Sequence, residues 1–127
     1  MTQLGRDARD RVSDLDKRFL FEFLSQSRYG VVSSLSPDAT PQSALVGIAV
    51  SEELEIVFDT LRTTRKYRNL MARPACAFVI GWAGEQTAQL EGIAGEPVGI
   101  ELERYRQIYF KTWPDGPAEP TGSRARR

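Results

Sequence analysis

Three apolar segments that follow one another on very short connections constrain the fold of this chain most strongly. Residues 29–35, 42–50 and 54–58 are rich in β-branched side chains, and Ser36 to Thr40 and Ser51 to Glu53 separate them. In the middle segment the side chains of Ala44, Val46 and Ile48 share one face. Parallel strands need crossovers of a dozen residues or more, so these segments predict an antiparallel meander.

The rest of the chain extends this meander into a small barrel. Residues 75–82 are almost wholly apolar, which is typical of a strand that is buried on both faces or closes a barrel. Residues 86–98 predict a further strand, interrupted by Gly92, Gly95 and Pro97. Apolar residues recur at helical spacing over 15–27, 66–72 and 100–112. We therefore predict a mainly β (α+β) fold: an antiparallel, Greek-key-like barrel with an N-terminal helix, a short helix after the third strand and a C-terminal helix.

The length and the apolar pattern indicate a single domain. The 127 residues suffice for one core. We place the domain at residues 13–113, between a flexible N-terminus (1–12) and a flexible basic tail (114–127). No apolar run approaches the about 20 residues that span a bilayer, and the first residues lack the apolar core of a signal peptide. We therefore expect a cytoplasmic protein with no membrane partner.

Charge and composition exclude several classes of function. The 17 basic and 17 acidic side chains cancel, which argues against nucleic acid as a partner. The sequence has no histidine, so a Ser-His-Asp triad, a Cys-His pair and a histidine metal site are all excluded. The single cysteine, Cys76, excludes an internal disulfide or a cysteine zinc cluster, and its apolar neighbours predict a structural thiol. We predict no metal site, and any redox chemistry would need a cofactor.

The junction between the third strand and the short helix collects groups that suit a phosphate. Hydroxyl donors, first-turn N–H groups and cations come together within a few residues there. The residues concerned are Thr60, Thr63, Thr64, Arg65 and Lys66. A cation in the first turn of a helix costs about 0.3–1 kcal/mol at an exposed site, and a bound anion would reverse that sign. A solvated basic helix face that includes Arg62, Arg68 and Arg73 is the alternative, and both interpretations stay open.

Two single residues also have more than one interpretation. Gly47, inside the second strand, indicates either a bulge or a flat ligand close to the backbone. Asp59 ends the third strand and is either a polar contact to a ligand or a cap of the following helix. No residue stands out as a catalytic acid or base.

The order and spacing of several short motifs resemble one known family. These motifs are Gly30-Val31-Val32-Ser33 with Pro41-Gln42-Ser43, Ile56-Val57-Phe58-Asp59-Thr60, Thr64-Arg65-Lys66, Asn69-Leu70, Arg73-Pro74 and Gly92-Ile93-Ala94. From about Leu15 to Phe110 the chain resembles the pyridoxamine 5'-phosphate oxidase-like, FMN-binding split β-barrel family.

The resemblance implies a homodimer with FMN at the interface and a small-molecule substrate. By analogy, Phe58, Asp59 and Thr60 would lie along the flavin, and the triplet Thr64, Arg65 and Lys66 would bind the 5'-phosphate. The backbone of Leu45, Val46 and Gly47 would border the isoalloxazine ring. The partner subunit would add polar and aromatic groups, for which the weaker candidates are Trp82, Gln86 and Thr87.

The chain departs from authentic pyridoxamine phosphate oxidases at their substrate motifs. Those enzymes have an arginine in the strand that corresponds to residues 43–47 and a C-terminal motif of arginine and histidine, and this chain has neither. The resemblance therefore implies an FMN-dependent oxidoreductase that acts on another small molecule. A deazaflavin-dependent reductase on the same fold and a non-catalytic flavin-binding module are the alternatives.

Overall fold

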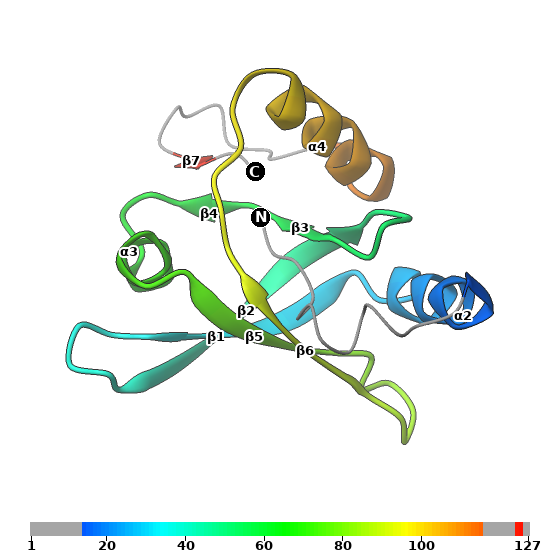
Figure 1. The fold of residues 1–127 in the computed structure, drawn as a ribbon, viewed down its shortest axis with the longest axis horizontal. Coiled ribbons are helices and arrows are strands. Elements are labelled where there is room, and N and C mark those ends of the chain that lie inside the picture. The colour runs from blue at the N-terminus through cyan, green and yellow to red at the C-terminus, as the bar shows by residue number, and fades with distance from the viewer. Residues whose placement is uncertain (1–13, 116–123, 126–127) are drawn as a thin grey trace.

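The computed structural model describes residues 14–115 and 124–125, and its centre is one curled antiparallel sheet (Figure 1). The sheet has five strands in the order β3-β2-β1-β5-β6. The strands are β1 (Tyr29–Leu35), β2 (Pro41–Val50), β3 (Ile56–Phe58), β5 (Ala75–Ile80) and β6 (Ala88–Ile93). The curl makes the sheet a half-barrel, which confirms the predicted mainly β, split-barrel fold.

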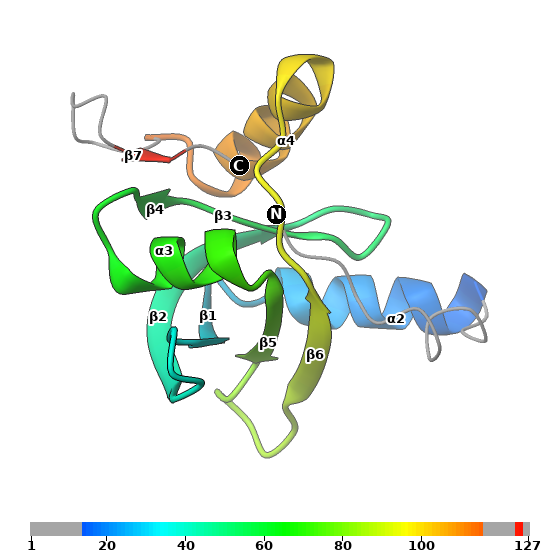
Figure 2. The same ribbon diagram turned by 60° about the vertical axis from the view of Figure 1, so that its left-hand side comes forward.

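Three helices surround the sheet. They are α2 (Asp14–Ser25), α3 (Arg65–Ala72) and α4 (Gly99–Thr112). Figures 1 and 2 both show α2 and α3 on opposite sides of the curled strands, with α4 beyond β3. Within the described residues, no helix combines the length and the apolar character that a membrane crossing requires.

The alternation of strand residues divides the packing into two layers. The main core lies inside the curl, where Leu24 of α2 and Leu70 of α3 pack with the inward-facing side chains of the strands. Those strand residues are Val32, Val46, Ile48, Ile56, Phe58, Phe78, Ile80 and Leu90. On the other face of β2 and β3, Ala49 and Val57 pack against Tyr105 of α4. Because neighbouring residues of a strand point to opposite faces, β3 and the end of β2 are buried on both sides.

A hydrogen-bonded carboxylate fixes α4 to this outer layer. Glu55 accepts hydrogen bonds from the Tyr105 hydroxyl (2.5 Å), from Arg104 Nη2 (3.0 Å) and from Ser51 Oγ (3.0 Å). Burial alone raises the pKa of Glu55, but these hydrogen bonds outweigh it, so that the pKa lies below its ordinary value. The carboxylate therefore stays ionised beneath the helix.

Two predicted strands differ in detail from the observed ones. In β5 the side chains of Phe78 and Ile80 are buried, but Val79 between them is 36% exposed, so this strand is buried on one face only. It ends at Ile80, directly before Gly81, whose φ of 91° is strained for other residues. The next strand ends at Ile93 instead of continuing to Val98. The partner strand β5 begins at Ala75, which lies opposite Ile93, so the predicted extension has no residue of β5 to pair with.

The chain order brings α3 beside the first hairpin. β1 and β2 pair so that Val32 lies opposite Ala44 and Ser34 lies opposite Gln42. The two-residue strand β4 (Thr60–Leu61) precedes α3 and pairs with β7 (Arg124–Ala125), a pairing that the sequence did not predict. The predicted flexible N-terminus (1–12) and most of the predicted tail (116–123 and 126–127) lie outside the described residues.

Candidate functional site

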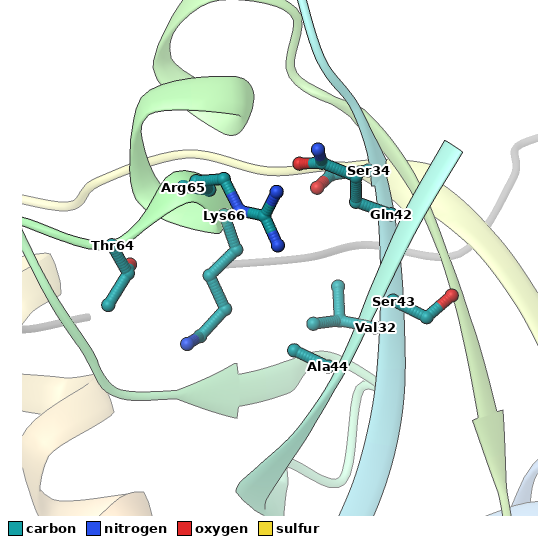
Figure 3. A pocket seen from close by; sticks show the side chains of 8 residues that line it. All are labelled: Val32, Ser34, Gln42, Ser43, Ala44, Thr64, Arg65 and Lys66. Carbon is teal, nitrogen blue, oxygen red and sulfur yellow. The ribbon is translucent and has the colours of Figure 1, made fainter. Parts of the chain in front are cut away.

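A cavity of about 190 Å³ lies between the start of α3 and the β1–β2 hairpin (Figure 3). In Figure 3 the side chain of Arg65 extends from the helix toward the two strands, and that of Lys66 runs from the helix into the space between Thr64 and Ala44. The lining residues are Val32, Ser34, Gln42, Ser43, Ala44, Thr64, Arg65 and Lys66. The cavity thus contains the predicted triplet Thr64, Arg65 and Lys66, together with residues of β1 and β2 that were not among the predicted site residues.

Thr64 begins the helix, and its hydroxyl is already engaged. As the N-cap of α3, it accepts a hydrogen bond from the Tyr67 N–H (3.2 Å). It also donates its single hydrogen to the Leu61 carbonyl (2.8 Å) and lies 3.1 Å from the Thr60 hydroxyl. Thr64, and not Asp59, therefore caps this helix. Because its hydrogen is used, the donors that remain in the first turn are the N–H groups of Arg65 and Lys66, which have no acceptor within the helix.

The basic residues of this region fall into two groups. Arg62 pairs with Glu96 (3.3 Å), Arg68 donates to the Thr63 carbonyl (3.1 Å), and Arg73 donates to the Pro37 carbonyl (3.0 Å). Within residues 14–115 and 124–125, no hydrogen bond or ion pair engages the side chain of Arg65 or Lys66. Of these five basic residues, the two that line the cavity are thus the ones whose side chains have no hydrogen bond or ion pair in the described structure.

The electrostatics of this end of α3 favour an anion. The first turn contains no acidic residue, and the helix macrodipole places partial positive charge there. Lys66 is half-buried, and burial lowers the pKa of its ammonium group. A lowered pKa means that the protein environment destabilises the charged form of this lysine. A negative group in the cavity would stabilise both cations and accept the remaining N–H donors.

The cavity wall that faces the start of α3 is polar, and two of its side chains accept hydrogen bonds from Asn69 of the same helix. The Asn69 side chain is 4% exposed and donates from Nδ2 to Ser34 Oγ (3.1 Å) and to Gln42 Oε1 (2.8 Å). The sequence did not identify Ser34, Gln42 or Asn69 as site residues. A signal was present, because Gln42 falls on the same face of β2 as Ala44 and Val46, where a polar residue is out of place.

The predicted ring-bordering residues of β2 lie further along the same strand. Leu45 is 60% exposed, Val46 is buried in the core, and Gly47 faces Trp113. A Cβ atom built on Gly47 would lie 2.8 Å from Trp113 Cζ2. The indole also donates from Nε1 to the Ile48 carbonyl (3.0 Å). In this structure Gly47 is therefore small because an indole packs on its backbone, and its β1 partner, Tyr29, pairs with it in regular register without a bulge.

The other predicted site residues divide between the core and the surface. Phe58 is 1% exposed and packs edge-on against Phe78, so any cofactor contact there would come from its backbone. Asp59 is half-buried, and Thr60 is buried beside Thr64. Trp82, Gln86 and Thr87 are exposed on the connection between β5 and β6 and do not line the cavity. Within the described residues, no cluster of acidic or cysteine side chains could hold a metal ion.

Several solved structures share this fold. A heme binding protein from Mycobacterium smegmatis superimposes with a TM-score of 0.71 at 17% identity, over 91% of this chain and 50% of its own. An F420 reductase gives 0.62 at 22% identity, over 81% of this chain and 85% of its own. A candidate pyridoxamine 5'-phosphate oxidase from Listeria innocua gives a TM-score of 0.65 at 20% identity, over 85% of this chain and 86% of its own. This chain thus spans half the length of the heme binding protein, and at these identities the likeness concerns the fold.

The family assignment comes from the sequence itself. None of the curated proteins matches the chain. The family model described as pyridoxamine 5'-phosphate oxidase matches residues 17–120, which include every strand of the curled sheet and the whole cavity. The chain therefore belongs to the pyridoxamine 5'-phosphate oxidase family.

Proposed function

We propose that this chain is a flavin-binding oxidoreductase that holds the 5'-phosphate of FMN in the cavity at the start of α3 and acts on a small molecule. One observation carries the proposal. Arg65 and Lys66 line the cavity without a protein partner in the described structure, while Arg62, Arg68 and Arg73 around them are all engaged. In this part of the chain, the cations left for a ligand are therefore the two that line the cavity.

The cavity offers what a terminal phosphate needs. Two cations, the N–H groups of Arg65 and Lys66, and the polar groups of Ser34 and Gln42 surround it. A bound phosphate would offset the desolvation of Lys66 and the unfavourable helix dipole at the same time. Charge-assisted hydrogen bonds of this kind are about twice as strong as neutral ones.

The size of the cavity limits how much of the ligand it can hold. Pockets for whole small molecules have volumes of about 300–1,000 Å³, whereas this cavity has about 190 Å³. It therefore suits the phosphate and the adjoining part of the chain, and the ring would lie outside it. We propose that a second copy of the chain supplies the missing wall in a homodimer, with Trp82, Gln86 and Thr87 as the partner's contribution.

The division of chemistry follows from the residues present. A bound flavin would supply the hydride or electron transfer, and this chain would bind it, orient it and exclude water. Around the cavity Lys66 and Arg65 hold charge, and the backbone of Phe58, Asp59 and Thr60 would run along the ligand. We assign no residue as a catalytic acid or base, so a non-catalytic flavin-binding module is the alternative within the same proposal.

The similarity to an F420 reductase favours a deazaflavin as the second candidate cofactor. Its longer, more acidic tail would use the same two cations, with Arg65 exposed at the cavity. A heme is less well supported, because the chain has no histidine to ligate an iron and would have to use cysteine, methionine or tyrosine.

The test is an absorption spectrum of the purified protein followed by a titration with FMN. We expect binding with a micromolar or lower Kd, weakened at least about tenfold, or about 1.4 kcal/mol, in the double variant Arg65→Ala, Lys66→Ala. Lys17→Ala with Arg18→Ala is the matched control, because it removes an adjacent exposed basic pair from α2. This control should bind FMN as the wild type does.

A colourless protein that does not bind FMN would overturn the FMN proposal. Titration with a deazaflavin would then decide for or against this second candidate cofactor. Equal weakening in both double variants would show that bulk charge, and not the cavity, attracts the ligand. Sedimentation with and without FMN would test the homodimer.

A further inference from the structure

A single buried amide arranges the polar wall of the cavity. Asn69 Nδ2 donates to both Ser34 Oγ and Gln42 Oε1, at 3.1 and 2.8 Å. An amide nitrogen has two hydrogens and accepts none, so these two bonds use its full capacity. Asn69 itself is 4% exposed and does not line the cavity. It therefore acts on the cavity through its two neighbours.

The two bonds decide which atoms of the neighbours remain for a ligand. Gln42 has its carbonyl oxygen engaged and keeps the two hydrogens of Nε2. Ser34 accepts from Asn69 and keeps its hydroxyl hydrogen. Both residues line the cavity together with the donors Arg65 and Lys66, and no carboxylate is among the lining residues. This wall therefore presents hydrogen-bond donors to a ligand.

We propose that Asn69 is a positioning residue that makes the cavity wall a set of donors and so selects a fully ionised phosphomonoester over its protonated form. This inference rests on the proposed function, that the cavity binds the phosphate of FMN, and adds that the cavity prefers this phosphate as the dianion. The terminal oxygens of a dianionic phosphomonoester only accept hydrogen bonds, which matches the wall. The monoanion has a P–OH group that would need an acceptor, and the second pKa of such a phosphate is about 6.

The first experiment compares FMN with riboflavin, which has no phosphate, in wild type and in Gln42→Glu. The glutamate can still accept from Asn69 but presents a carboxylate oxygen to the cavity in place of the Nε2 donor. At pH about 7.5 we expect FMN to bind at least about tenfold more weakly and riboflavin within about twofold of wild type. Gln89→Glu, an exposed residue of β6, adds the same charge elsewhere and should change neither affinity.

The pH dependence supplies a second readout of the same wall. In wild type, FMN affinity should rise between pH about 5 and 7.5 as the phosphate loses its second proton, while riboflavin affinity stays level. Gln42→Glu should flatten or reverse that rise, because its carboxylate can accept from the P–OH of the monoanion. An unchanged pH profile in Gln42→Glu would overturn the proposal.

A double-mutant cycle tests whether Asn69 acts through Gln42. Asn69→Ala and Gln42→Ala should each weaken FMN binding about tenfold. The double variant should lose far less than the about hundredfold that two independent sites would give. Additive effects, or an equal loss of FMN and riboflavin in Asn69→Ala, would show that Asn69 only supports the fold.

Inorganic phosphate separates this inference from the proposed function. If wild type binds neither flavin, the proposed function fails, but the donor wall is still measured by titrating inorganic phosphate and following the backbone amide signals of Arg65 and Lys66 by NMR. Shifts in wild type that Gln42→Glu removes would support the donor wall. The absence of shifts in wild type, or equal shifts in both proteins, would overturn it.

Discussion

Substitution of Gly47 by alanine should destabilise the protein because Trp113 occupies the space that the new methyl group needs. The Cβ would lie 2.8 Å from Trp113 Cζ2, which is closer than real Cβ atoms approach other atoms, and 3.2 Å from Cε2. The indole cannot simply withdraw. Its Nε1 is bonded to the Ile48 carbonyl at 3.0 Å, and the Arg28 guanidinium lies over the ring, 4.1 Å from its centroid.

The magnitude follows from two opposing effects. Overpacking of this kind costs about 1–3 kcal/mol. Replacing glycine by alanine at a compatible backbone position restores about 0.4–1 kcal/mol by restricting the unfolded chain. We therefore expect a net loss of about 0.5–2 kcal/mol in the free energy of unfolding, which lowers Tm by about 2–7 °C for a domain of this size.

The assay is urea unfolding of four proteins: wild type, Gly47→Ala, Trp113→Leu and the double variant. Without the indole, the clash disappears and only the favourable backbone effect remains, so Gly47→Ala should stabilise the Trp113→Leu protein by about 0.4–1 kcal/mol. This reversal of sign is the decisive result. If Gly47→Ala has the same effect in both backgrounds, Trp113 does not determine the need for glycine, and a bound ligand against the strand becomes the better explanation.

Three further predictions concern the site and the attachment of α4. Lys66 should titrate below the ordinary lysine value of 10.5 in ¹³C NMR of its Cε atom, because burial lowers its pKa, and added phosphate should raise that pKa. Titration of Lys66 at its ordinary value would refute the burial argument. Thr64→Ala should lower the free energy of unfolding by about 1 kcal/mol through loss of the N-cap, whereas Thr64→Ser should keep most of that stability. Equal losses of stability for the two variants in denaturant unfolding would show that the cap is not responsible. Glu55→Gln should reduce stability by about 1–3 kcal/mol at neutral pH. Because the folded pKa of Glu55 is depressed, its contribution to stability is fully present above the ordinary pKa of 4.5 and is lost as the pH falls through the folded pKa. A difference in unfolding free energy between wild type and Glu55→Gln that stays constant down to pH about 3 would contradict this.

The amino-acid sequence was sufficient to predict the architecture. The alternation in residues 29–58 and the short connections determine antiparallel strands, since a parallel pair would need a long crossover. The strand-to-helix junction was also visible locally, and Arg65 and Lys66 do line the cavity. Local periodicity and the residue types at the junction carry this information within a few residues, and so no tertiary contact is needed to infer it.

Tertiary structure decided which groups of that junction are available to a ligand. Five basic side chains look equivalent in the sequence, but contacts with distant segments, such as that of Arg62 with Glu96 and that of Arg73 with Pro37, engage some of them and leave Arg65 and Lys66 at the cavity. The bonds from Asn69 to Ser34 and Gln42 join residues 35 and 27 positions apart. The contact of Trp113 with Gly47 spans a still longer separation. Such pairings depend on how the sheet curls and where helices settle on it, and no local pattern encodes them.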